Sequence, residues 1–113
     1  MNYQIFFAEH FKKQLKSYAK KYRRLQEDII CALEMFDKSS AVYLGSQTYK
    51  IRVRARDISK GKSHAFRMII LVVEIDGIIA PVVIYFKGDR ANIERKEIAY
   101  HAMIVHEEIE RIR

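Results

Sequence analysis

Hydrophobic residues in the first third of the chain recur at intervals of three and four, the period of one face of an α-helix. The first series is Phe11, Leu15, Tyr18 and Tyr22, and the second is Leu25, Ile29, Leu33 and Phe36. Neither glycine nor proline marks a break between them, and we place it near Tyr22 to Arg24. The pattern predicts two antiparallel helices. The aromatic segment at residues 2–7 predicts a short strand before them.

The middle of the chain changes to a period of two, which is typical of a β-strand. Gly45 opens this region, and the predicted strand runs from about Thr48 to Arg56. One side of it carries Tyr49, Ile51, Val53 and Ala55, and the other carries Lys50, Arg52, Arg54 and Arg56. The strand therefore holds a row of cations on a rigid support.

Two apolar segments follow, and they predict a buried β-hairpin. Phe66 to Ile75 is almost continuously apolar after Arg67, which favours a central or doubly covered strand. Asp76 and Gly77 tolerate positive φ and predict a tight turn into a strand from Ile78 to Phe86. Pro81 lacks an N–H to donate, so we expect a bulge or an edge position there.

The last segment predicts a helix capped by Asn92. Its apolar stripe comprises Ile98, Ala102, Val105, Ile109 and Ile112. This stripe either packs on the sheet, the interpretation we favour, or contacts a partner helix. The predicted class is α+β in the order β-α-α-β-β-β-α, with a helical hairpin on a small, mainly antiparallel sheet. The length of 113 residues favours one domain, residues 1–113.

The charge distribution points to an anionic partner. The net charge is +7, and residues 45–73 contain seven Lys or Arg but one Asp or Glu. Such a row could be the solvated face of an antiparallel strand. Solvated faces usually mix both signs, however, and four neighbouring cations repel one another, which favours nucleic acid as the partner.

Several other classes of protein are disfavoured. The single cysteine, Cys31, excludes an internal disulfide, fits a reducing compartment, and is expected to be a small buried residue of the second helix. We see no signal peptide, and acidic residues, Gly77 and Pro81 interrupt the apolar segment from Met68 to Phe86, which argues against a membrane span. The histidines are scattered and no phosphate-loop motif is complete, so we expect neither a metal nor another cofactor.

The predicted hairpin gathers basic residues at its open end. A turn at Asp76-Gly77 would place Arg67 opposite roughly Phe86, and therefore close to Lys87. The basic loop that starts at Ser59 belongs to the same end.

The order of elements and three motifs resemble the RelE/ParE superfamily of toxins from bacterial type II toxin–antitoxin modules, in particular its HigB/RelE-like branch. The motifs are Y-K-I-R-V, K-G-K-S-x-x-F-R and V-V-I-Y-F-K-G-D-x-x-N-I. The resemblance implies a cytoplasmic, ribosome-dependent mRNA endoribonuclease that a cognate antitoxin holds inactive. Its partners would be that antitoxin, the ribosome and mRNA.

The resemblance also implies roles for individual residues. Arg67 and Lys87 would be catalytic together with Lys50, and the RNA-binding residues would be Arg52, Arg54, Lys60, Lys62 and Arg90. The row of cations on the predicted strand adds Arg56 to the RNA-binding residues. Metal-free RNA cleavage needs a base for the 2′-hydroxyl and cations for the phosphorane. Lys50 or Lys87 could supply the base, and Arg67 could clamp the phosphate through two hydrogen bonds.

Two other functions remain open. One is a ParE-like toxin that targets gyrase, and the other is a protein that binds nucleic acid or an antitoxin without cleaving RNA. Arg67 with Lys87 beside the basic strand is the feature that favours RNA cleavage over both.

Overall fold

The structure is a computed structural model that describes residues 2–58 and 66–112. These residues form the helices α1 (Glu9–Ala19), α2 (Leu25–Glu34) and α3 (Arg95–Arg111), and the strands β1 (Gln4–Ile5), β2 (Val42–Gly45), β3 (Thr48–Val53), β4 (Phe66–Val73) and β5 (Ile78–Phe86). The described strands form one sheet in the order β1-β5-β4-β3-β2, in which only β1 with β5 is a parallel pair. The predicted α+β class is confirmed.

Strand β2 was not predicted. Gly45 was predicted to lie just before the first of the three consecutive strands. Instead, Gly45 ends β2, and Ser46 and Gln47 form the turn into β3 with positive φ values of 50° and 65°. Two successive residues of positive φ make the kind of turn that suits a two-residue hairpin. Such turns usually contain Asn-Gly or Asp-Gly, so Ser-Gln gave no recognisable signal.

Strand β3 is shorter than predicted, because it ends at Val53 and not at Arg56. The backbone N–H of Arg56 donates to Asp28 Oδ2 at 3.0 Å, and Arg56 Nε donates to Asp28 Oδ1 at 2.6 Å. Asp28 lies on α2, so these bonds turn the chain away from β4 and fix it to the helix. Arg56 is therefore not part of the row of cations on β3.

The hairpin of β4 and β5 agrees with the predicted strand at Ile78–Phe86. Its turn is longer than predicted, because a 3₁₀ turn at Glu74–Asp76 precedes Gly77, whose φ is 63°. The register shifts opposite Ile69 and Ile70, where Val83 and Pro81 are their partners. The irregularity predicted at Pro81 is thus confirmed.

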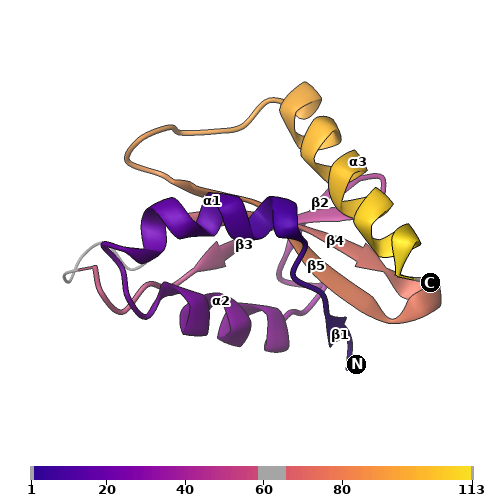
Figure 1. The fold of residues 1–113 in the computed structure, drawn as a ribbon, viewed down its shortest axis with the longest axis horizontal. Coiled ribbons are helices and arrows are strands. Elements are labelled where there is room, and N and C mark those ends of the chain that lie inside the picture. Colours follow the sequence, from indigo (N-terminus) through magenta and orange to yellow (C-terminus); the bar gives the residue numbers. More distant parts are fainter. Residues whose placement is uncertain (1, 59–65, 113) are drawn as a thin grey trace.

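Helices α1, α2 and α3 lie around the sheet (Figure 1). The sheet has an apolar cluster on each face. Helices α1 and α2 cover the face to which Met68, Ile70 and Val72 of β4 belong. Helix α3 covers part of the opposite face, to which Ile69, Leu71 and Val73 belong. We call these the α1/α2 face and the α3 face.

Helix α3 packs on the sheet as favoured, since Val105 and Ile109 are buried in the second cluster. Two details of the prediction were wrong. The N-cap is Glu94 and not Asn92, and Ile112 is 63% exposed. Cys31, which was predicted to be buried, is exposed, because it lies two positions from both Ile29 and Leu33 on the buried side of α2 and therefore on the other side of the helix.

Residues Met68 to Phe86 form the hairpin of β4 and β5, as expected, and no helix in the described ranges is long and apolar enough to cross a membrane. Within the same ranges no group of three or more His, Cys, Asp or Glu could hold a metal ion.

The side chain of Gln14 forms hydrogen bonds with two backbone groups at the outer edge of β5, and these bonds give a first prediction. Gln14 Nε2 donates to the Val82 carbonyl at 2.9 Å, and Ile84 N–H donates to Gln14 Oε1 at 3.3 Å. Gln14→Ala removes the partners of two backbone groups on a buried strand, so it should lower the free energy of unfolding by about 1–3 kcal/mol. Urea unfolding measures this, with Ser17→Ala on the exposed side of α1 as the control. Equal stability of Gln14→Ala and Ser17→Ala would contradict the prediction.

Candidate nucleic-acid interface

A row of polar side chains crosses three strands on the α3 face. Arg52 of β3 is paired with Arg67 of β4, and Arg67 is paired with Tyr85 of β5. Side chains directly opposite one another have Cβ atoms about 4.5–5.5 Å apart. Like charges at such positions destabilise a sheet, so Arg52 beside Arg67 favours an anion as a further component of this surface.

Lys50 lies on the same face, two residues before Arg52 along β3 and opposite Ile69. It is half-buried, whereas Arg52 is exposed. A groove of about 1000 Å³ contains Lys50, Arg52, Arg54 and Arg67 in its lining. Lys50 also lines a smaller hollow of about 400 Å³ beside Arg95 at the start of α3.

The groove follows the outer edge of β3. Strand β2 pairs with β3 only from Thr48 to Lys50, so the edge from Ile51 to Val53 has no neighbouring strand among the described residues. The opposite wall is formed by α2 and the residues after it, which contribute Glu27, Asp28, Cys31, Ala32, Met35, Phe36 and Asp37. The groove therefore has a basic side and a mixed acidic and apolar side.

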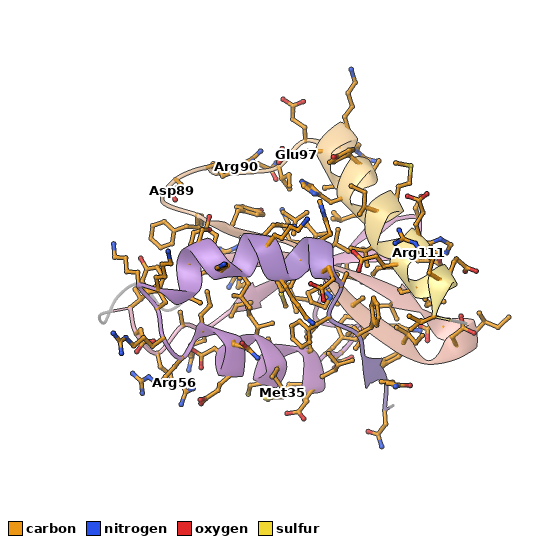
Figure 2. The ribbon with its side chains drawn as sticks, viewed as in Figure 1. Met35, Arg56, Asp89, Arg90, Glu97 and Arg111 are labelled. Atoms are coloured by element: carbon orange, nitrogen blue, oxygen red, sulfur yellow. The ribbon has the colours of Figure 1, made fainter. Side chains whose placement is uncertain are left out.

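Arg56 lines this groove but is bound to the acidic side. Its Nη2 donates to Glu27 Oε1 at 3.0 Å, in addition to the bonds with Asp28, and the hydrogen bonds that Arg56 donates to these two carboxylates raise its pKa. Figure 2 shows Arg56 near α2. The predicted row of four cations on one strand is thus wrong at Arg56, and Arg54 also lies beyond the end of β3. Lys60 and Lys62, also predicted to bind RNA, lie outside the described residues.

Arg67 and Lys87 belong to the same end of the β4–β5 hairpin, as the sequence predicted. The register differs by one residue, because Arg67 lies opposite Tyr85 and Phe66 lies opposite Phe86. Lys87 is exposed and follows the last residue of β5. The shift of one residue puts Tyr85, and not Phe86, on the same face as Arg67.

Arg90 lies on the connection between β5 and α3 and is bound to Glu97 in the first turn of α3 (Figure 2). Their two bonds are 3.0 Å (Nη1 to Oε2) and 2.8 Å (Nη2 to Oε1), and Arg90 Nε donates to the Asn92 carbonyl at 3.1 Å. The guanidinium carbon of Arg90 is 5.9 Å from the centre of the Tyr85 ring. Neither Glu97 nor Tyr85 was among the residues singled out in the sequence.

The pair of Arg90 and Glu97 gives a prediction on pH. Hydrogen bonding by Arg90 holds the pKa of Glu97 below its ordinary value of 4.5. A carboxyl whose pKa is lower in the folded protein stabilises the fold above the unfolded pKa, and this contribution disappears as pH falls through the folded pKa. Glu97→Gln should therefore unfold at lower urea than the parent at about pH 7, and the difference should shrink at about pH 3. Glu107→Gln, on an exposed position of α3, is the control. If Glu97→Gln remains less stable than the parent by the same amount at about pH 3, the ionised pair with Arg90 is not the cause of the difference.

Two histidines that are far apart in the sequence meet between α1 and α3. Nε2 of His10 and Nδ1 of His101 are 2.6 Å apart, so one ring donates a proton and the other accepts it. Burial lowers the pKa of His101, and the nearby His10 lowers it further. The backbone N–H groups of Glu9 and His10 also donate to Glu108 of α3, at 2.8 and 3.0 Å. These contacts fix α3 to the start of α1, and no local signal in the sequence predicts them.

Comparison with known proteins gives a fold but no sequence family. No family model and no curated protein matches the chain. The free-state structure of a mutant of the E. coli toxin RelE is 18% identical, covers 91% of this chain and 96% of RelE, and has a TM-score of 0.51. A second structure of isolated E. coli RelE is 16% identical, covers 98% of this chain and 99% of RelE, and has a TM-score of 0.50. A chain of the intact E. coli RelBE toxin–antitoxin complex is 20% identical over 73% of this chain and 93% of its own length, with a TM-score of 0.47.

The two isolated RelE structures, which match almost the whole of both chains, are the basis for the fold assignment. This chain has the α+β fold of the RelE toxin.

Proposed function

We propose that this protein is the toxin of a type II toxin–antitoxin module and acts as a ribosome-dependent, metal-free mRNA endoribonuclease. The observation that carries the proposal is the row of Arg52, Arg67 and Tyr85, with Lys50 beside it, on a RelE-like fold. Sites that bind the RNA backbone need cations spaced along a groove, and this groove has them on one side.

The proposed reaction is attack by the ribose 2′-hydroxyl on the adjacent phosphorus. The bond between the 2′-oxygen and phosphorus forms, the bond from phosphorus to the 5′-oxygen breaks, and the proton of the 2′-hydroxyl passes to a base. Lys50 or Lys87 is the base in this proposal, and the 5′-oxygen takes a proton from water as it leaves. Arg67 would bind the phosphorane oxygens through two N–H groups, whose fork geometry matches phosphate.

The mRNA would be placed by the ribosome, since correct positioning of a 2′-hydroxyl for in-line attack supplies a large part of such a rate enhancement. The protein would therefore act in the cytoplasm, with the ribosome and mRNA as partners. A cognate antitoxin is the other partner we propose. The exposed apolar side chains of Met35, Val42 and Tyr43 offer it a surface at the end of α2 and on β2.

Expression with and without the adjacent open reading frame, followed by mapping of mRNA ends, tests this function. We expect growth arrest and new mRNA ends within translated regions when the protein is expressed alone, and neither when its antitoxin is present. Lys87→Ala should abolish both effects, whereas Lys96→Ala, an exposed lysine of α3, should not. Growth arrest with DNA breaks and intact mRNA would instead indicate a ParE-like toxin, and no arrest would indicate a binding protein without catalysis.

A further inference from the structure

The hydroxyl group of Tyr85 is buried without a hydrogen-bond partner among the described residues. The residue is 2% exposed, and its hydroxyl oxygen is the only buried side-chain polar atom in residues 2–58 and 66–112 found in this state. Buried hydroxyls in folded proteins nearly always have a partner, so an exception calls for a specific explanation.

The cations around Tyr85 cannot accept its proton. Arg67 lies directly opposite on β4, and Arg90 lies over the ring at 5.9 Å. Guanidinium groups only donate hydrogen bonds. Burial raises the pKa of Tyr85 above 10.0, while Arg67 and Arg90 act in the opposite direction, so the phenol keeps its proton at neutral pH and remains a donor. The missing partner of the hydroxyl is therefore a hydrogen-bond acceptor. An oxyanion is such an acceptor, and the two arginines would attract its negative charge.

Glu97 shows how Arg90 binds an oxyanion. Both carboxylate oxygens of Glu97 accept from Arg90, at 2.8 and 3.0 Å, with the two-pronged geometry that an arginine also uses for phosphate. Glu97 belongs to α3, whereas Arg90 belongs to the connection before it. The same guanidinium that binds Glu97 thus lies over the ring of Tyr85.

We propose that Tyr85, Arg67 and Arg90 form a subsite for one phosphate group, in which the Tyr85 hydroxyl donates to a non-bridging oxygen and Glu97 occupies Arg90 until the phosphate binds. The identification of this phosphate as part of an RNA backbone rests on the proposed function. The subsite itself requires only a phosphate oxyanion. Glu97 then regulates the site, because it competes with the ligand for the same guanidinium group.

Two pairs of variants test the subsite by equilibrium binding. Tyr85→Phe removes only the donor, and Tyr43→Phe makes the same change at an exposed tyrosine of β2. Glu97→Gln removes the competing charge, and Glu107→Gln makes the same change at an exposed position of α3. The probes are inorganic phosphate and a short single-stranded RNA whose 2′-hydroxyls are replaced by hydrogen so that it cannot be cleaved. Titration is followed by NMR of the backbone amides at about pH 7.

We expect Tyr85→Phe to weaken binding of both probes about tenfold, the usual effect of losing a hydrogen bond to a charged group, and Glu97→Gln to strengthen it several-fold. The two control variants should bind like the parent. Unchanged binding by Tyr85→Phe, or weaker binding by Glu97→Gln, would overturn the proposal. Binding of RNA but not of inorganic phosphate, again weakened in Tyr85→Phe, would support a subsite that needs the rest of the nucleotide.

Thermal unfolding gives an independent check. Because the Tyr85 hydroxyl has no partner among residues 2–58 and 66–112, Tyr85→Phe should be at least as stable as the parent. A clear loss of stability would mean that the hydroxyl is already bonded in the free protein, and this would also overturn the proposal. Failure of the parent to cleave mRNA would refute the proposed function, whereas the phosphate titrations would still decide the subsite.

Discussion

Arg67→Ala is expected to reduce mRNA cleavage on the ribosome by about 100- to 1000-fold, the usual effect of removing one donor that stabilises charge in a transition state. Arg67 occupies the middle of the row, between Arg52 and Tyr85, and is half-buried. An arginine in such a position is held by its neighbours and can present two N–H groups to the phosphorane. The measurement is the rate of cleavage of a defined mRNA in a purified translation system, with growth arrest as the cellular readout.

Two further variants make the result specific. Arg67→Lys keeps the charge but loses the planar pair of donors, so its rate should fall between those of the parent and Arg67→Ala. Arg111→Ala removes an exposed arginine near the end of α3 and should leave the rate unchanged (Figure 2). If Arg67→Ala cleaves mRNA at the parent's rate while remaining folded, Arg67 is not part of a catalytic site.

Phe66→Ala is expected to lower the free energy of unfolding by about 3–5 kcal/mol, the range for loss of a fully buried aromatic ring. Phe66 is completely buried and its ring contacts those of Tyr18, Tyr22 and Phe86, with centroids 5.1, 5.3 and 5.3 Å away. These rings belong to α1, to the turn after it and to the end of β5. The cluster therefore fixes the end of the sheet that carries Arg67 on the opposite face.

Urea unfolding measures this effect, with Phe66→Leu as the matched variant that fills most of the same space. We expect Phe66→Leu to lose clearly less stability than Phe66→Ala, because its residual cavity is smaller. A loss below about 1 kcal/mol for Phe66→Ala would show that the ring cluster does not stabilise this end of the sheet.

The sequence determined the elements whose signals are local. A period of three and four placed α1 and α2, and the apolar segment after Gly77 gave the bounds of β5, because the periodicity of a helix or strand depends only on neighbours along the chain. A period of two placed Lys50 and Arg52 on one side of β3, where the structure also has them. The sequence did not predict β2, since its turn at Ser46 and Gln47 lacks the usual residues.

The tertiary structure decided which side chains meet. The 3₁₀ turn at Glu74–Asp76 and the irregularity opposite Ile69 and Ile70 together changed the register by one residue at Arg67 and put Tyr85 beside it. Asp28 binds Arg56 and holds it away from the other cations. The contacts of His10 with His101 and of Arg90 with Glu97 depend on how α3 is placed over the sheet. Such contacts follow from turn geometry and from packing between distant segments, and neither leaves a periodic signal in the sequence.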